Sequence, residues 1–365
     1  MSKKTLIALA CLAGVGSASA QVASTGGGAV TSSFVTLFGV IDAAAQYGDG
    51  SIDNNTRLVS GAHTSSRLGF RGVEDLGGGL GAGFWLEIGL NADDGTGQAS
   101  NTNNQPSGAG VAGAGVSFNR RSTVSLMGTD WGELRIGRDY VATFRNRDQV
   151  DPFGTVGVGQ NQADNGSIVG VTSTRASNMI GYFLPANRLG GFFGEAQYYL
   201  GETPGNSDGD GWQARLGYGT SMWGIALAGA KTRYTQSATL GDTTVWNVGA
   251  HLDFGWTRFS AGYYRDEVDR IGGLKATGYL VGAVVPIRND VIRASYSSYG
   301  TDAAGDPTAR KLAIGYVHNL SKRTAAYATY AHIDNRGTSA VGLGGSSTAS
   351  GANSDGFDIG LKHSF

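Results

Sequence analysis

The chain has 365 residues, among them 61 glycines, 15 tyrosines, 6 prolines and a single cysteine. Removing the leader predicted below takes 2 of the 28 basic residues away, which leaves 26 against 29 acidic residues and a net charge of −3. Nucleic-acid binding is therefore not expected, because it usually requires a basic excess.

Residues 1–20 are predicted to be a signal peptide. Lys3 and Lys4 form the positive start, an apolar stretch follows, and three small residues at 18–20 suit signal-peptidase cleavage. The only cysteine, Cys11, lies inside this leader, so the mature protein would have no thiol for disulfides, metal sites or catalysis. A lipoprotein leader ending at Cys11 would be only about ten residues long and is disfavoured.

Beyond the leader, the glycine-rich segment 21–33 precedes the first predicted strand and leaves the cleavage position open. No later apolar run approaches the roughly 18 residues that a transmembrane helix needs. A chain that crosses lipid without such helices must do so as a closed sheet.

A two-residue alternation recurs from residue 34 to the end of the chain. In residues 82–90, Phe84 and Leu86 share one face while Trp85 and Glu87 share the other. The same separation of apolar from charged side chains appears in 67–71, 133–136 and 357–365, whereas strand 34–47 is less regular. This pattern is typical of strands with lipid on one face and water on the other, and it places Glu87 inside.

Turn signals divide the chain into 16 strands. Seven tight reversals are predicted at 74–79, 129–132, 185–188, 220–223, 254–256, 286–290 and 319–322. Eight longer, polar connections are predicted near 48–62, 91–115, 140–175, 201–211, 235–243, 267–274, 300–309 and 334–355. Fifteen connections predict a 16-stranded antiparallel transmembrane β-barrel, residues 34–365, with short turns on one rim and long loops on the other.

A barrel of about 16 strands is too wide to be filled by its own wall and leaves an aqueous channel. The third long loop, 140–175, is the longest stretch without a strand pattern, and loops of that length are usually functional or disordered. We expect it to fold inward and constrict the pore.

Several segments, in order, resemble the trimeric general porins of Gram-negative outer membranes, particularly the beta-proteobacterial branch. They are FVTLFGVIDAA (34–44), SSRLGFRGVEDLGGGLGAGFWLEIGLNADDG (65–95), FNRRSTVSLMG (118–128), WGELRIGRDY (131–140), DPFGTVGVG (151–159), GYVHNLSKRTAAYATY (315–330) and GLKHSF (360–365). The resemblance implies a homotrimer in contact with outer-membrane lipid and lipopolysaccharide, and passive diffusion of ions and small polar solutes without a cofactor. It also implies an assembly signal at the terminal Phe365.

The resemblance further implies which residues line the pore. Pro152, Phe153 and Gly154 resemble the turn at the tip of the inward loop, and close members often prefer anions, using wall arginines opposite that loop. In the matching motifs these arginines are Arg67, Arg120, Arg121 and Arg175. Alternation favours Arg121 over Arg120, because Val124 and Leu126 are in register with Arg120.

Arginine suits an anion path because it stays charged and presents several donors in one plane. Arg135 and Arg138 are further candidates on the same wall. The opposing acidic side is expected to comprise Glu87 and the loop residues Asp148, Asp151 and Asp164. The alternative is that the arginines only pair with Glu87, Glu133 or Asp139 and stiffen the wall.

Other functions are less well supported. An adhesin or autotransporter translocator would need a large passenger before the first strand, and a channel specific for sugars or organic acids would need an aromatic track, of which Trp85 beside Glu87 is a hint. Gly108, Gly110 and Gly113 fit a dinucleotide motif but sit in a loop without a following helix. No enzyme, cofactor or bound metal is expected, although a weak surface cation site near residues 206–211 stays open.

Overall fold

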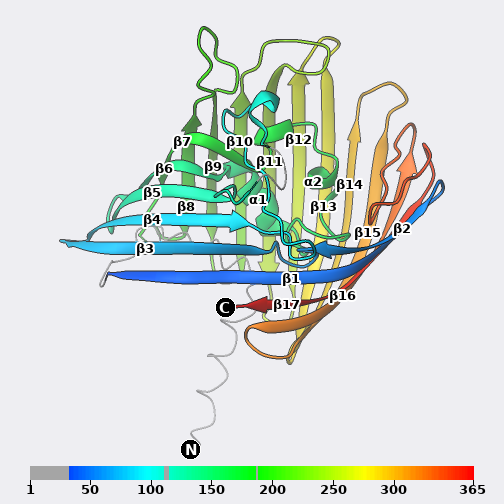
Figure 1. Cartoon of the computed structure of the whole chain (residues 1–365), viewed down its shortest axis with the longest axis horizontal. Coiled ribbons are helices and arrows are strands. Elements are labelled where there is room, and N and C mark those ends of the chain that lie inside the picture. The colour runs from blue at the N-terminus through cyan, green and yellow to red at the C-terminus, as the bar shows by residue number, and fades with distance from the viewer. Residues whose placement is uncertain (1–32, 111–114, 186–187) are drawn as a thin grey trace, which may run out of the picture.

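The computed structural model describes residues 33–110, 115–185 and 188–365, so the predicted leader 1–20 and all but Ser33 of segment 21–33 lie outside it. In these residues, 17 strand segments form one antiparallel sheet that closes on itself (Figure 1). Segments β2 (Asn54–Ser60) and β3 (Arg67–Gly77) pair one after the other with β1 (Phe34–Gly50). They count as one interrupted strand, so the barrel has 16 strands, as the sequence predicts.

The remaining strands follow in chain order around the wall. They are β4 (Leu80–Gly89), β5 (Arg121–Gly128), β6 (Gly132–Tyr140), β7 (Arg175–Phe183), β8 (Phe192–Tyr199), β9 (Gly211–Gly219), β10 (Trp223–Thr232), β11 (Asp242–Asp253), β12 (Arg258–Asp269), β13 (Leu274–Ile287), β14 (Asp290–Thr301), β15 (Thr308–Asn319), β16 (Thr324–Arg336) and β17 (Ser354–Ser364). Among the described residues, no helix is long and apolar enough to span a membrane.

The barrel closes where β17 pairs with β1. The terminal Phe365 completes this seam, since its backbone exchanges hydrogen bonds of 3.0 and 3.1 Å with Gly39. A Cβ atom at Gly39 would lie too close to the Phe365 ring, so a larger residue there would require that ring to shift.

The wall has the predicted alternation. On β4, Phe84 is 38% exposed on the outer face, whereas Trp85 and Glu87 are 5% and 1% exposed on the inner face. On β6, Leu134 and Ile136 face outward in the same way. Trp85 therefore lies on the inner face of the wall, beside Glu87.

Strand connections lie where turn signals place them, but several are shorter than predicted. The connections predicted at 48–62 and 267–274, for example, shrink to residues 51–53 and 270–273, because β1, β2, β12 and β13 continue through the polar segments. These strand ends have the composition of a loop although their backbone remains paired.

The long connection between β6 and β7 contains α1 (Ala142–Val150), α2 (Gln162–Asn165) and the single 3-10 turn η3 (Gly170–Thr172). Helix α1 contacts β8 to β12 and α2 contacts β13 to β15, so the segment lies against the inner wall, as predicted (Figure 1).

Candidate pore constriction

Polar side chains of the wall hold α1 inside the barrel. Gln213 on β9 accepts hydrogen bonds from the backbone N–H of Thr143 at 3.1 Å and from its hydroxyl at 2.7 Å. Asn146 donates to Asn247 on β11 at 2.8 Å. Since no side chain caps the start of α1, these contacts replace the missing cap and fix the direction of the loop.

Asp151 organises the tip of the loop. Its carboxylate accepts backbone N–H bonds from Phe153 (2.9 Å), Thr155 (3.1 Å) and Asn161 (2.9 Å). Gly154 has φ +63°, a conformation that glycine adopts without a steric penalty. The predicted Pro152-Phe153-Gly154 turn is therefore closed by the carboxylate that precedes it.

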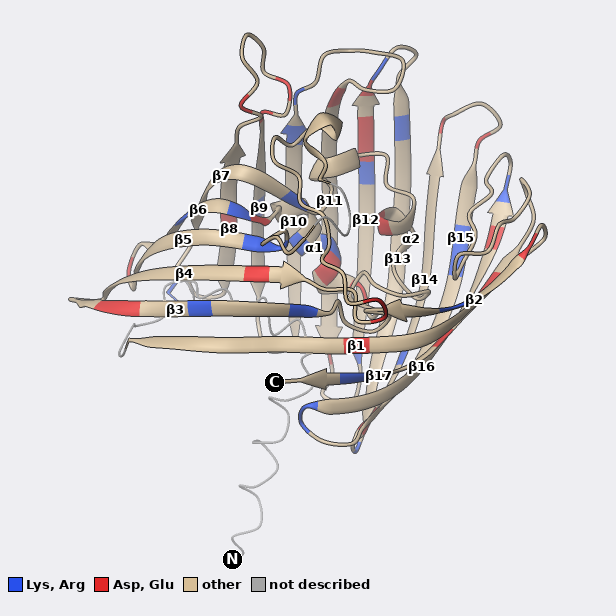
Figure 2. Cartoon of the chain, in the orientation of Figure 1, with Lys and Arg blue, Asp and Glu red and all other residues tan. Residues whose placement is uncertain are grey.

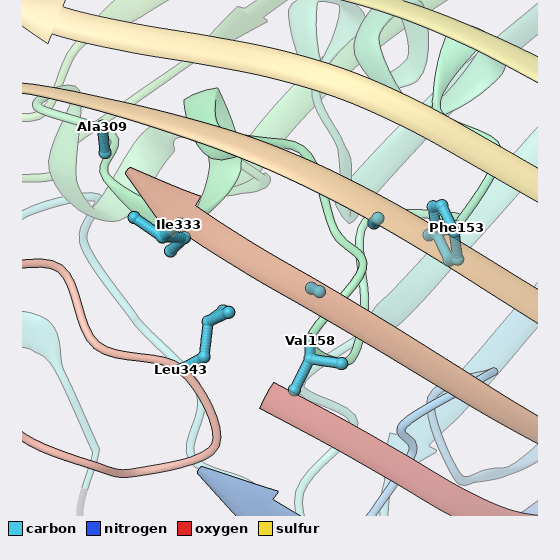
Figure 3. Close-up of a cluster of buried hydrophobic side chains, with 7 residues drawn as sticks. Phe153, Val158, Ala309, Ile333 and Leu343 are labelled. Carbon is cyan, nitrogen blue, oxygen red and sulfur yellow. The ribbon is translucent and has the colours of Figure 1, made fainter. Parts of the chain in front are cut away.

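Phe153 attaches the tip to the barrel wall. Its ring is buried with Val158 against β15, β16 and the loop that follows β16 (Figure 3). The other members of this cluster are Ala309, Ala313, Ala331, Ile333 and Leu343. The guanidinium carbon of Arg293 lies over the same ring, 4.7 Å from its centroid.

A cavity of about 350 Å³ lies between the loop and the facing wall. Among the described residues its charged lining comprises five arginines and two aspartates: Arg67, Arg120, Arg145, Arg175, Arg293, Asp148 and Asp164. The uncharged lining includes His63, Thr64, Ser65, Gln98, Tyr140, Phe144, Pro152, Phe153, Gly154, Thr155, Val156, Gln160, Ser173 and Thr174. The excess of three positive charges in this lining favours an anion over a cation.

Three predicted arginines converge on one side of the cavity. Arg120 donates to Glu87 at 2.6 Å, and the Nε of Arg67 lies 3.9 Å from the same carboxylate. Arg120 and Arg175 both donate to the Tyr140 hydroxyl, at 2.5 and 2.7 Å, and Arg175 stacks on that ring at 4.2 Å. We call Arg67, Arg120, Arg175 and Glu87 the aperture cluster.

The other three predicted arginines do not line the cavity. Arg135 is 1% exposed and bonds to Glu133 at 2.9 Å and to Asp139 at 2.5 Å. Arg121 lies 3.7 Å from Asp139. We call these four residues the wall cluster.

Arg138 also lies away from the cavity, where it fastens the connection between β4 and β5. It donates to the carbonyl oxygens of Asn119 and Asn101 and to the hydroxyl of Ser177. The sequence placed Arg121 ahead of Arg120, but the structure places Arg120 in the lining. Arg120 precedes the first paired residue of β5, so the alternation of that strand does not determine its direction.

Two arginines of the lining, Arg145 and Arg293, were missed from the sequence. Arg293 shares the inner face of β14 with Ser295 and Ser297, so alternation alone could have indicated it. Arg145 lies on α1 and reaches Asp139 at 2.8 Å. No local pattern indicates its direction, which depends on how the helix docks.

The predicted acidic residues occupy three different positions. Glu87 lies among the arginines rather than opposite them. The Asp151 carboxylate accepts backbone hydrogen bonds within the loop tip. Asp164 lines the cavity and pairs with Arg147 at 2.9 Å. Burial, together with the charges of Asp151 and Asp164, raises the pKa of Asp148 to about 6.

The described residues contain no group of three or more His, Asp or Glu side chains arranged to hold a metal ion. What the cavity offers is a set of fixed positive charges on one wall and a facing loop with fewer negative charges. Such an arrangement can sort solutes by size and charge.

Comparison with known proteins agrees with this geometry. The family model described as Gram-negative porin matches residues 5–338. The chain is 36% identical to outer membrane porin protein 32 of Delftia acidovorans over the full length of both chains. The solved anion-selective porin from Comamonas acidovorans matches with a TM-score of 0.80 and 32% identity, over 91% of this chain and 100% of that one.

A more distant structure shares only the fold. OmpT of Vibrio cholerae, solved in a trimer form, matches with a TM-score of 0.63 at 14% identity, over 92% of this chain and 100% of that chain.

Proposed function

Because the chain belongs to the Gram-negative porin family, whose members are non-enzymatic outer-membrane channels, we propose that its pore prefers anions and selects them at the aperture cluster. The observation that carries the proposal is the cavity lining, with five arginines against two aspartates. The similarity to the anion-selective porin from Comamonas acidovorans supports it.

The mechanism follows from the fixed geometry of the guanidinium groups. Glu87 and Tyr140 hold Arg67, Arg120 and Arg175 in place, yet one carboxylate cannot neutralise three arginines. An anion that enters exchanges part of its hydration for guanidinium contacts, and water in the pore keeps these contacts weak enough for release. Cations are repelled over the same section.

We further propose that the protein works as a homotrimer surrounded by outer-membrane lipid and lipopolysaccharide. The trimer form of OmpT, which has the same fold, supports this assembly. The outward apolar side chains of the strands, among them Leu227, Val281 and Ile314, suit contact with lipid or with a second copy. Phe365, at the seam, is proposed as the assembly signal.

The aperture is tested by the double charge reversal Arg67→Glu with Arg175→Glu. Reversal potentials in a KCl gradient across a planar bilayer should shift toward cation preference. The matched control, Lys322→Glu with Arg323→Glu, changes the same charge at the exposed turn between β15 and β16 and should behave as wild type. Reversal potentials that stay at the wild-type value in the double arginine variant would reject the aperture role.

A further inference from the structure

Arg71 lies outside the aperture cluster but on the same face of the same strand as Arg67. The two residues are four positions apart on β3, which corresponds to about 13 Å along the strand. Arg71 is the one nearer the short turn, and Figure 2 shows two separate blue bands on β3, with a red band closer to the turn. An anion that leaves the aperture toward the short-turn rim therefore approaches Arg71 next.

Aromatic rings, rather than a carboxylate, hold Arg71. Its guanidinium carbon lies 5.1 Å from the centroid of Trp85 and 5.5 Å from that of Phe38. These two rings pack edge to face at 5.1 Å, and the Trp85 indole donates to Glu87 at 3.0 Å. The platform under Arg71 is thus connected directly to the aperture cluster.

Arg71 differs from the neighbouring arginine on the same platform. Arg121 stacks on Trp85 at 4.5 Å, but it also donates to Thr123 at 3.1 Å and lies 3.7 Å from Asp139. Among the described residues Arg71 has no carboxylate within 4.0 Å, and its Nε has no hydrogen-bond partner. The side chain is half-buried, so solutes in the lumen can reach it.

We propose that Arg71, on the platform of Phe38 and Trp85, is a second anion station that binds carboxylates on the short-turn side of the aperture. Stacking engages the face of a guanidinium and leaves its N–H edge for a ligand. That edge matches the two oxygens of a carboxylate. The proposal rests on the proposed anion path and adds a preference among anions to it.

The test uses the full-length refolded channel in planar bilayers, with conductance measured against concentration in potassium acetate and in potassium chloride. Arg71→Gln should raise the half-saturating acetate concentration about threefold, the size expected for one solvent-exposed charge pair, and change the chloride curve less. Arg71→Lys keeps the charge but loses the planar fork, so it should weaken acetate binding and leave the chloride curve unchanged. Arg188→Gln, at an exposed turn, is the matched control.

Two results would overturn the station. If the acetate curve of Arg71→Gln coincides with that of wild type, Arg71 does not bind acetate. If Arg71→Lys binds acetate as well as wild type does, a positive charge alone is sufficient and the guanidinium does not recognise the carboxylate. Neither result depends on the ion selectivity of the Arg67 and Arg175 double variant. The proposal for Arg71 and the proposal for the aperture cluster can therefore be rejected independently. If Arg71→Gln does not refold, Arg71→Lys still carries the acetate comparison.

Discussion

The aperture cluster and the wall cluster are built from the same residue types on neighbouring strands, yet only one of them lines the cavity. The aperture cluster sets three arginines against one carboxylate, Glu87. The wall cluster sets Arg121 and Arg135 against Glu133 and Asp139, and Asp139 also binds Arg145 of the cavity lining at 2.8 Å. Inside the wall each arginine is thus matched by a carboxylate, whereas in the aperture cluster one carboxylate is shared by arginines that reach the cavity.

The largest expected effect concerns stability and distinguishes the two clusters most sharply. Arg135→Ala would leave the buried Glu133 without its arginine, at a cost of about 3–5 kcal/mol in the free energy of unfolding. Arg67→Gln should cost less, because Glu87 keeps Arg120 at 2.6 Å. The free energies of unfolding of both variants can be measured by urea denaturation in lipid vesicles. Equal unfolding midpoints for the two variants would contradict the distinction.

The aperture depends on the facing loop, whereas the wall cluster lies between strands. Phe153→Ala removes a buried ring and should weaken attachment of the loop tip by about 3 kcal/mol. Single-channel recordings should then show larger conductance and more frequent current fluctuations. The control is Leu76→Ala, at the exposed end of β3, with currents expected to match wild type. If Phe153→Ala has wild-type conductance and wild-type current fluctuations, other contacts hold the loop tip.

A smaller effect is expected from the phenol that orders two of the aperture arginines. Tyr140→Phe keeps the ring under Arg175 but removes the hydroxyl that accepts from Arg120 and Arg175, at a cost of about 1 kcal/mol. Anion preference, measured as a reversal potential, should fall slightly, and the wall cluster should be unaffected. A preference as low as that of the double arginine variant would mean that the phenol, not the charge, controls selection.

The smallest effect is a pH dependence confined to the cavity. Because Asp148 has a pKa raised to about 6, lowering the pH from 7 to 5 protonates it and removes a negative charge from the lining. Anion preference should therefore rise as the pH falls. Asp148→Asn should show a smaller rise than wild type over the same pH range, because Asp151, whose pKa burial also raises to about 6, still titrates. An equal rise in both proteins would assign the titration to another group.

The barrel could be predicted from the sequence because the alternation of side chains along a strand is a local property. Alternation gave the inner position of Arg67, turn signals gave the strand number, and the length of the stretch 140–175 indicated the inward loop. Local alternation could not say whether an inward arginine is neutralised, since the partners of Arg135 and Arg121 include Asp139, whose placement depends on a register shift near the end of β6. The lengths of β1 and β12 were underestimated for a related reason, because strands outside lipid lose the apolar half of the pattern.

The loop residues show the other limit. Arg145 reaches the cavity only because Gln213 and Asn247, far away in the sequence, orient α1. Asp151 looked like a charge facing the pore, but three backbone N–H groups of its own turn engage it. These roles depend on tertiary contacts of the folded loop, which local sequence patterns do not predict.

The seam between β1 and β17 joins residue 39 to residue 365, so the contact that makes the cylinder continuous is also the one between the most distant strands. Contacts of such long range form slowly. Until they form, the growing sheet has two unpaired edges that can recruit strands of other molecules. The protein is therefore most prone to aggregation during folding, before the final strand pairs with β1, and less so once the barrel has closed.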